Sequence, residues 1–239
     1  MLILAIDTST RTGSVALLRD NLVVDQVSGY EETPHSTRLF RDLELLQSRA
    51  HFSLGDVDVF AVAAGPGSFT GLRVGLTAVK AWSEVYGKPI APVSGLEAIA
   101  AQSLSLKGSA PVSGTIAPFV DARRGQLFGS LYRPTGTNGS LQLISEESIL
   151  TVEEFVEIVK GNRDGRNTIL VSPTPEILPA ENWKVSLPET EIETVSAVLA
   201  PTIGHLGFDL ALRGDLVDAL SLDANYVRRS DAESRWKDE

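Results

Sequence analysis

Ala5-Ile6-Asp7, with Gly13-Ser14-Val15-Ala16-Leu17 behind it, has a counterpart in Phe119-Val120-Asp121, with Gly125-Gln126-Leu127-Phe128-Gly129 behind it. In each stretch a strand-like run ends on an aspartate and turns through glycine into a second strand-like run. Turns from aspartate to glycine are common in any antiparallel meander, so this match alone leaves an internal duplication open. The order of the elements around the two stretches favours a duplication.

The first half of the chain begins with three short apolar runs between turn-forming residues, which predict an antiparallel meander. Thr33-Pro34 then predicts a helix start, with threonine as the N-cap and proline at the first helical position. Leucines at helical spacing follow this start. The expected strands lie at 2–6, 14–18, 22–27, 57–64 and 89–93, and the expected helices at 34–50, 69–86 and 95–106.

The second half repeats this order less regularly. Thr151 and Glu154 form a capping box, which predicts the start of its first helix. The expected strands lie at 115–120, 126–132, 141–145 and 168–171, and the expected helices at 152–160 and 195–213. The sequence therefore predicts an α/β fold made of two versions of one unit with the order β-β-β-α-β-α.

A glycine-rich stretch, Gly65-Pro66-Gly67-Ser68-Phe69-Thr70-Gly71-Leu72-Arg73-Val74-Gly75, lies between a predicted strand and a predicted helix. A glycine turn before a helix can hold a phosphate on free backbone amides. The stretch lacks the Gly-Lys-Ser/Thr of a P-loop, and it fits a dinucleotide fingerprint poorly because it follows the fourth strand. In the structural alternative, Gly71 and Gly75 leave one edge of the helix without side chains, so that a neighbouring backbone approaches closely.

The helix expected at 69–86 is apolar on two sides, and a helix of this kind does not lie on a sheet with its back in water. One stripe packs on the sheet, whereas the other needs either the 34–50 helix or a partner chain. The sequence leaves both alternatives open. The two stripes are Phe69, Leu72, Leu76, Val79 and Tyr86, and Val74, Ala78, Ala81 and Val85.

Asp7 follows the first strand and is itself followed by the hydroxyl residues Thr8, Ser9 and Thr10. Such a group can hold magnesium and contact phosphate oxygens in a nucleotide-binding domain. The alternative is an Asx-type turn that only closes the hairpin.

Composition excludes several classes of protein. The 239 residues carry a net charge of −10, which repels a phosphate backbone, so we do not expect an autonomous nucleic-acid binder. Cysteine is absent, and the three histidines form no zinc motif. No basic leader or long apolar run occurs, so we expect a soluble cytoplasmic protein that does not enter a membrane.

Two further stretches each have two interpretations. Asp121-Ala122-Arg123-Arg124 suits an anion or an acidic partner surface, or it is a solvated hairpin tip. The extended basic strip Asn225-Tyr226-Val227-Arg228-Arg229-Ser230 packs back across the first half of the chain, or it is a simple tail.

Together, four motifs resemble the bacterial TsaB family, also called YeaZ. They are Ile6-Asp7-Thr8-Ser9, the glycine-rich stretch 65–75, Asp121-Ala122-Arg123-Arg124 and Tyr226-Val227-Arg228. The resemblance implies an actin-like ATPase (ASKHA) fold of two ribonuclease-H-like lobes with mixed sheets. It places the first lobe at 1–107, a degenerate second lobe at 108–214, and a segment at 215–239 that packs back on the first lobe.

The resemblance also implies a role without catalysis. Members of the family pair with their paralogue TsaD, which holds the metal and the catalytic site, and the ATPase TsaE joins them. Together they threonylcarbamoylate the adenosine next to the anticodon in tRNAs that read codons beginning with A. TsaD relatives carry a His-x-x-x-His pair, whereas this chain has only His35 with Thr37, Leu39 and Arg41 beyond it.

The expected function is therefore a scaffold or activator subunit that meets tRNA only through the complex, forms a homodimer when alone, and requires no metal or cofactor of its own. The sequence leaves open whether ATP or ADP binds with magnesium at a subunit interface, near Asp7 and Thr8–Thr10. The alternative is an ATP-binding enzyme or a glycoprotease-like peptidase of the same fold. The candidate partner-binding residues are Leu39, Leu43, Leu46, Leu72, Leu76 and Val79.

Overall fold

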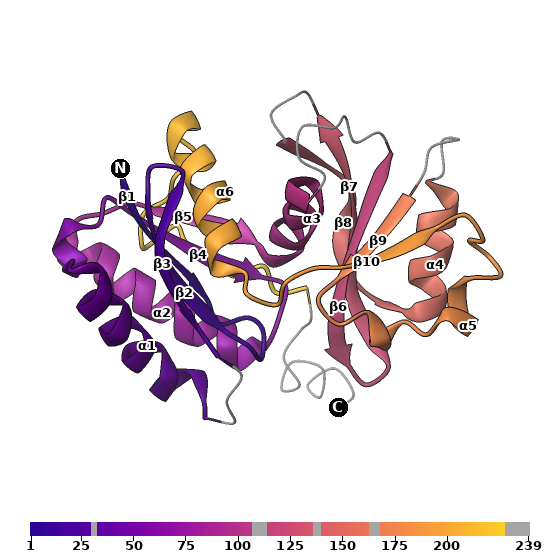
Figure 1. Ribbon diagram of the computed structural model, residues 1–239, viewed down its shortest axis with the longest axis horizontal. Helices are drawn as coiled ribbons and strands as arrows, with labels where there is room; N and C mark the ends of the chain where they lie inside the picture. The colour runs from indigo at the N-terminus through magenta and orange to yellow at the C-terminus, as the bar shows by residue number, and fades with distance from the viewer. Residues whose placement is uncertain (30–32, 107–113, 136–139, 163–167, 228–239) are drawn as a thin grey trace, which may run out of the picture. The chain divides into compact units, whose positions relative to one another are not determined.

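The computed structural model describes residues 1–29, 33–106, 114–135, 140–162 and 168–227 (Figure 1). The chain divides into two compact units. The first contains Met1–Gly95 and the described residues from Val198 onward, and the second contains Leu96–Ala197. The described carboxyl-terminal part therefore belongs to the same unit as the amino terminus.

The first unit is built on a five-stranded sheet with the order β3-β2-β1-β4-β5. β1 pairs antiparallel with β2 and parallel with β4, so the sheet is mixed. β1 and β4 are buried along their whole length, which explains why their sequences are apolar without alternation. The strands are β1 (Leu2–Asp7), β2 (Ser14–Arg19), β3 (Leu22–Ser28), β4 (Val59–Gly65) and β5 (Ile90–Ser94).

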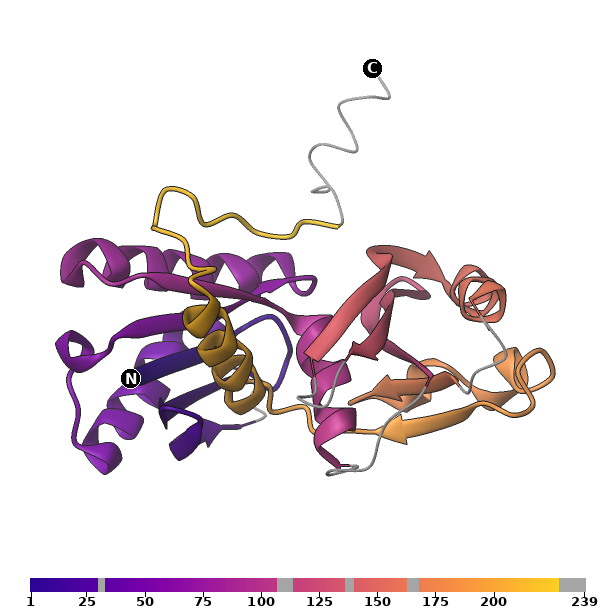
Figure 2. The same ribbon diagram turned by 90° about the horizontal axis from the view of Figure 1, so that it is seen from above.

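Helices cover both faces of this sheet (Figures 1 and 2). α1 (His35–Ala50) and α2 (Phe69–Tyr86) pack on one face, and α6 (Ala200–Arg213) packs on the other. Leu17 joins the core with α1 and α2, whereas the next residue of the strand, Leu18, lies against Gly204 of α6. None of the described helices is long and apolar enough to span a bilayer.

The second unit has a five-stranded sheet with the order β10-β9-β6-β7-β8. The rings of Phe119 and Phe155 pack at its centre with centroids 5.5 Å apart, and Trp183 closes the same core. Its elements are β6 (Thr115–Arg123), β7 (Gln126–Thr135), β8 (Ser140–Thr151), α4 (Val152–Gly161), β9 (Thr168–Ser172), α5 (Ala180–Trp183) and β10 (Glu191–Thr194), with the 3-10 turns η1 (Leu54–Asp56) in the first unit and η2 (Pro175–Ile177) in the second.

The two sheets have the same topology, which confirms the duplication. In each unit the first strand lies at the centre, the second pairs antiparallel with it, and the fourth pairs parallel with it on its other side. α1 and α4 occupy equivalent places between the third and fourth strands. The α/β fold with two mixed sheets is therefore as predicted, although α5 and β10 were not expected from the sequence.

The helix that follows the fifth strand of each sheet belongs to the other unit. Almost all of α3 (Gly95–Leu106), which follows β5, belongs to the second unit. α6 follows β10, yet it packs on β1 and β4 because Gly204 and Gly207 let it approach the first sheet closely. The structure thus divides the chain differently from the expected lobes 1–107 and 108–214.

The described part of the carboxyl-terminal segment, residues 215–227, packs on the first unit. Val217 and Ile90 exchange two backbone hydrogen bonds of 2.8 and 2.9 Å. Leu222 is buried in the core of this unit, and the amide of Asn225 donates to the carbonyl of Ala64 at 2.7 Å. Residues 228–239, including the Arg228–Ser230 part of the basic strip, lie outside the described residues.

Candidate functional site

The glycine-rich stretch forms the turn between β4 and α2 and the first turns of α2. Ser68 is the N-cap of the helix, because its hydroxyl accepts the amide of Gly71 at 3.3 Å. The backbone of Ser68 in turn donates to the carbonyl of Ser9 at 2.9 Å. The stretch is therefore fixed against the turn that follows β1.

Gly71 and Gly75 provide the close approach that the sequence predicted, and the neighbouring backbone is that of Thr8. The hydroxyl of Thr8 donates to the carbonyl of Gly71 at 2.7 Å and accepts the amide of Gly75 at 3.1 Å. A Cβ atom added at Gly71 would collide with the Thr8 carbonyl oxygen. The structural interpretation of these two glycines is confirmed.

The structure brings Asp7, Thr8, Ser9 and Thr10 together, but the side-chain oxygens of Asp7, Ser9 and Thr10 form hydrogen bonds within the turn itself. One carboxylate oxygen of Asp7 accepts the amide of Ser9 at 2.8 Å and its hydroxyl at 2.6 Å. The other accepts the hydroxyl of Thr10 at 2.9 Å. Asp7 is fully buried. This geometry is that of an Asx-type turn that closes the hairpin. A magnesium or phosphate contact at these residues stays a prediction.

A buried charged pair beside this turn was missed at the sequence level. Arg38 is 2% exposed, its Nη2 donates to the carbonyl of Thr12, and its Nε lies 3.3 Å from the carboxylate of Asp42. His35, one helical turn earlier, has its Nε2 2.8 Å from the carbonyl of Thr10. Burial, followed by the nearby Arg38 guanidinium, lowers the pKa of His35. The i, i+4 spacing of Arg38 and Asp42 was the available sequence signal.

These groups support the hairpin turn from the side of α1. Pro34, rather than Thr33, is the N-cap of that helix, and no side-chain hydrogen bond caps it. Among the described residues, no group of three or more histidine, aspartate or glutamate side chains is placed to hold a metal ion.

The six residues predicted to bind a partner lie in the core of the first unit, so their assignment needs correction. None is more than 6% exposed, because α1 and α2 turn these side chains toward the sheet and toward each other. A partner cannot reach them on the folded chain. They are Leu39, Leu43, Leu46, Leu72, Leu76 and Val79.

The second apolar stripe of α2 faces outward only in part, because Ala78 is buried and Val74 packs against the core. Val85 is 74% exposed, and Ala81 is exposed one helical turn before it. Phe40 of α1 is 56% exposed and meets the half-buried Trp82 edge to face, with ring centroids 6.4 Å apart. We call the set Phe40, Val74, Ala81, Trp82 and Val85 the α1/α2 surface. It is the apolar face that the helices leave available to another chain.

Comparison with known proteins identifies the family. A family model described as tRNA N6-adenosine threonylcarbamoyltransferase (TsaD) matches residues 31–186. The tRNA threonylcarbamoyladenosine biosynthesis protein TsaB of Bacillus subtilis is 31% identical over 236 residues, which cover 99% of this chain and 98% of that protein. The chain belongs to the TsaB family. The TsaD description of the matching model agrees with the similarity between the two families that the sequence led us to expect.

Solved structures agree with this assignment. YeaZ from Pseudomonas aeruginosa has a TM-score of 0.74 at 26% identity, with 94% of this chain and 99% of that chain covered. A ROK hexokinase from Thermus thermophilus has a TM-score of 0.52 at 10% identity, over 90% of this chain and 100% of that chain. The second likeness concerns the fold alone, and it places the TsaB-family chain among the actin-like ATPase folds.

Three of the four TsaB-family motifs meet in the first unit. The first contributes Thr8 and Ser9, which bind the glycine-rich stretch, and the last contributes Tyr226, whose ring lies 5.1 Å from that of Phe69. Arg73 lies over the Phe69 ring at 3.8 Å and donates to the Tyr226 hydroxyl at 3.4 Å. These motifs therefore hold α2 and the carboxyl-terminal segment in place.

The fourth motif lies in the second unit, at the turn between β6 and β7. The amide of Arg123 donates to the carboxylate of Asp121 at 2.7 Å. Arg123 and Arg124 both adopt the left-handed conformation, with φ of 68° and 59°. This turn exposes both arginine side chains.

Proposed function

We propose that this chain is a non-catalytic subunit, a scaffold or activator, of a tRNA threonylcarbamoyladenosine-forming complex. It acts with a TsaD homologue and a TsaE homologue, and the complex modifies the adenosine next to the anticodon in tRNAs that read codons beginning with A. The single observation that carries the proposal is the exposed α1/α2 surface on a chain that aligns end to end with a protein named TsaB.

The α1/α2 surface supports the choice of a subunit. The sheet-facing sides of α1 and α2 are buried, whereas Phe40, Ala81 and Val85 stay exposed beside Val74 and Trp82, which pack partly against the core. Burying this surface against a second helical pair would remove apolar area from water, which favours association. The same surface suits a homodimer when the TsaD homologue is absent, since a two-fold pair brings one surface against itself.

The charge of the chain supports indirect contact with tRNA. A net charge of −10 opposes binding to a phosphate backbone, so we assign the tRNA contact to the partners. Because the substrate is tRNA, we propose that the protein acts in the cytoplasm.

The turn after β1 argues against an independent ATP-binding enzyme. The oxygens of Asp7 and the hydroxyl of Thr8 already make hydrogen bonds within the chain. The residue four positions after His35 is Leu39, a core residue, where a His-x-x-x-His pair would need its second histidine. If ATP or ADP with magnesium binds at a subunit interface, we propose that groups other than these side chains hold it.

Association in solution tests the proposal. The purified chain and a TsaD homologue from the same organism are run separately and mixed on a size-exclusion column with light scattering. We expect a heterodimer in the mixture and no ATPase or peptidase activity from the chain alone. Two proteins that elute independently, or magnesium-dependent ATP hydrolysis by the chain alone, would contradict it.

A further inference from the structure

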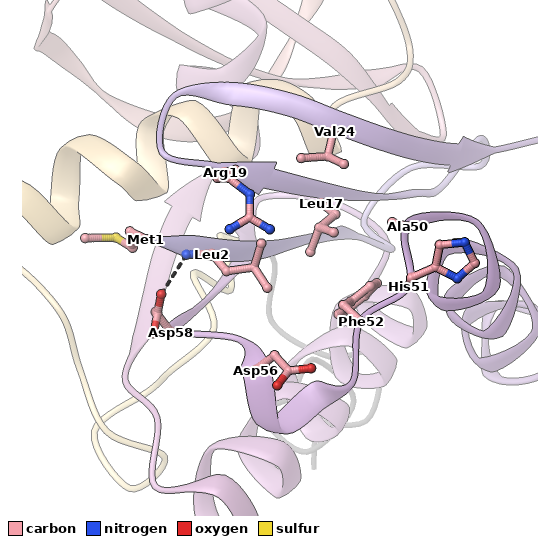
Figure 3. Close-up of a pocket in the computed structure, with 10 residues that line it drawn as sticks. All are labelled: Met1, Leu2, Leu17, Arg19, Val24, Ala50, His51, Phe52, Asp56 and Asp58. Carbon is pink, nitrogen blue, oxygen red and sulfur yellow. Dashed lines mark hydrogen bonds between the residues drawn. The ribbon is translucent and has the colours of Figure 1, made fainter.

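A cavity of about 280 Å³ lies in the first unit at the end of the sheet where β1 begins. Its apolar wall comes from Leu2 and Leu17, which are buried, and from Phe52, which follows α1. Figure 3 shows Arg19 on the β2 side and Asp56 on the η1 side, with Leu2 between them. The cavity shares no residue with the α1/α2 surface, so it is a separate site.

Opposite charges line this cavity without pairing. Arg19 at the end of β2, Asp56 in η1 and Asp58 before β4 all border it. Within the described chain, no ion pair joins Arg19 to either carboxylate. The exposed side chains of Arg19, Asp56 and Asp58 therefore border one cavity with polar and apolar walls, and none of the side chains that the structure describes forms an ion pair with them there.

Each carboxylate is held in place by one of its oxygens. Oδ2 of Asp58 accepts the amide of Leu2 at 2.7 Å. Oδ2 of Asp56 accepts the amide and the hydroxyl of Ser53 at 2.8 and 2.7 Å. These bonds, the backbone one first, lower the pKa of Asp56, so this carboxylate is ionised at neutral pH. Oδ1 of each residue accepts no hydrogen bond from the described residues.

We propose that this cavity binds an α-amino acid with an apolar side chain. The ligand carboxylate pairs with Arg19, the ammonium group pairs with Oδ1 of Asp56, and the side chain lies on Leu2, Leu17 and Phe52. A zwitterion carries an anionic group that can pair with Arg19 and a cationic group that can pair with the carboxylate of Asp56. The volume lies just below the range of about 300–1,000 Å³ typical of drug-sized ligands, which suits a smaller molecule.

Calorimetric titration of the full chain with L-leucine tests the site. We expect saturable binding that weakens at least about tenfold in Arg19→Gln and in Asp56→Asn. Arg49→Gln, which removes another exposed arginine of the same unit outside the cavity, should bind like the wild type. Because Asp56 also caps η1, Arg19→Gln is the variant that decides, and an unchanged melting temperature shows that it is folded.

Two analogues test the zwitterion. Isoamylamine lacks the carboxylate of leucine and isocaproate lacks its ammonium group, so each should bind at least about tenfold more weakly than leucine. Three results would each overturn the proposal: no saturable binding of leucine, undiminished binding by Arg19→Gln, or an analogue that binds as tightly as leucine.

Discussion

The Thr8 hydroxyl donates a 2.7 Å hydrogen bond to the carbonyl of Gly71 and so joins the turn after β1 to helix α2. The contact requires glycine, because a Cβ atom at position 71 would overlap the Thr8 backbone. It also fixes the rotation of α2, and that rotation decides which apolar stripe enters the core and which reaches the surface.

Gly71→Ala should therefore destabilise the first unit. Overpacking against a backbone that cannot move away costs about 1–3 kcal/mol, which urea denaturation measures. Gly55→Ala is the matched control, since a Cβ atom there would make ordinary contacts of 3.7 Å with the Tyr86 ring. Equal stability of the Gly71→Ala variant and the wild type would show that the contact does not constrain α2.

Val85→Glu should weaken association with the TsaD homologue at least about tenfold while leaving the melting temperature unchanged. Val85 is 74% exposed, so the charge costs nothing in the free chain but is desolvated in the interface. Leu76→Glu should instead prevent folding, because Leu76 is 6% exposed within the core.

The control for Val85→Glu lies in the second unit. Val185→Glu makes the same change at a position that is 89% exposed, outside the α1/α2 surface. If both variants bind the TsaD homologue with the affinity of the wild type in a titration, the α1/α2 surface is not the interface.

Leu18 and Gly204 should be energetically coupled. Gly204→Ala pushes a Cβ atom into the Leu18 side chain and should cost about 1–3 kcal/mol. Leu18→Ala leaves a cavity and should cost about 2–5 kcal/mol. The double variant should lose less than the sum, because the smaller side chain on β2 makes room for the methyl group added on α6. Strictly additive losses in a double-mutant cycle would contradict this packing.

Stability should fall as the solution becomes more acidic than the ordinary histidine pKa of 6.5. Burial lowers the pKa of His35 in the folded chain, so the unfolded chain binds the proton more readily. The contribution of His35 to the stability of the folded chain is complete above pH 6.5. It is lost as the pH falls through the lower pKa that His35 has in the folded chain. His205, whose pKa burial also lowers, acts in the same direction.

Denaturation of His35→Gln and His205→Asn across this pH range separates the two contributions. Each variant should show a smaller loss of stability on acidification than the wild type. A slope that neither substitution changes would assign the pH dependence to other groups.

The sequence predicted local structure well where distinctive residues begin and end an element. α2 has the expected bounds because Ser68 caps its start and Gly87, in the left-handed conformation, ends it. β10 was missed, since Glu191–Thr194 is short and carries two glutamates. The place of α6 could not be predicted, because it depends on Gly204 and Gly207 meeting a sheet that is distant in sequence.

In the candidate site too, local features could be predicted, whereas features that depend on residues distant in the sequence could not. Helical spacing identified two stripes on α2 but not their orientation, and the residues assigned to the partner were those in the core. The orientation follows from Thr8, 63 residues away in the chain, through the contact with Gly71. The hydrogen bonds that Asp7 makes within its turn likewise could not be predicted from the sequence, which left a hairpin turn and a phosphate site open.

The most direct test of the proposed function is reconstitution of threonylcarbamoyladenosine formation on tRNA from purified TsaD and TsaE homologues. Product is measured without this chain, with the wild type and with Val85→Glu. We expect modification only when the wild type is present, and a marked loss with Val85→Glu that a higher concentration of the variant restores. Full modification without the chain would contradict the account.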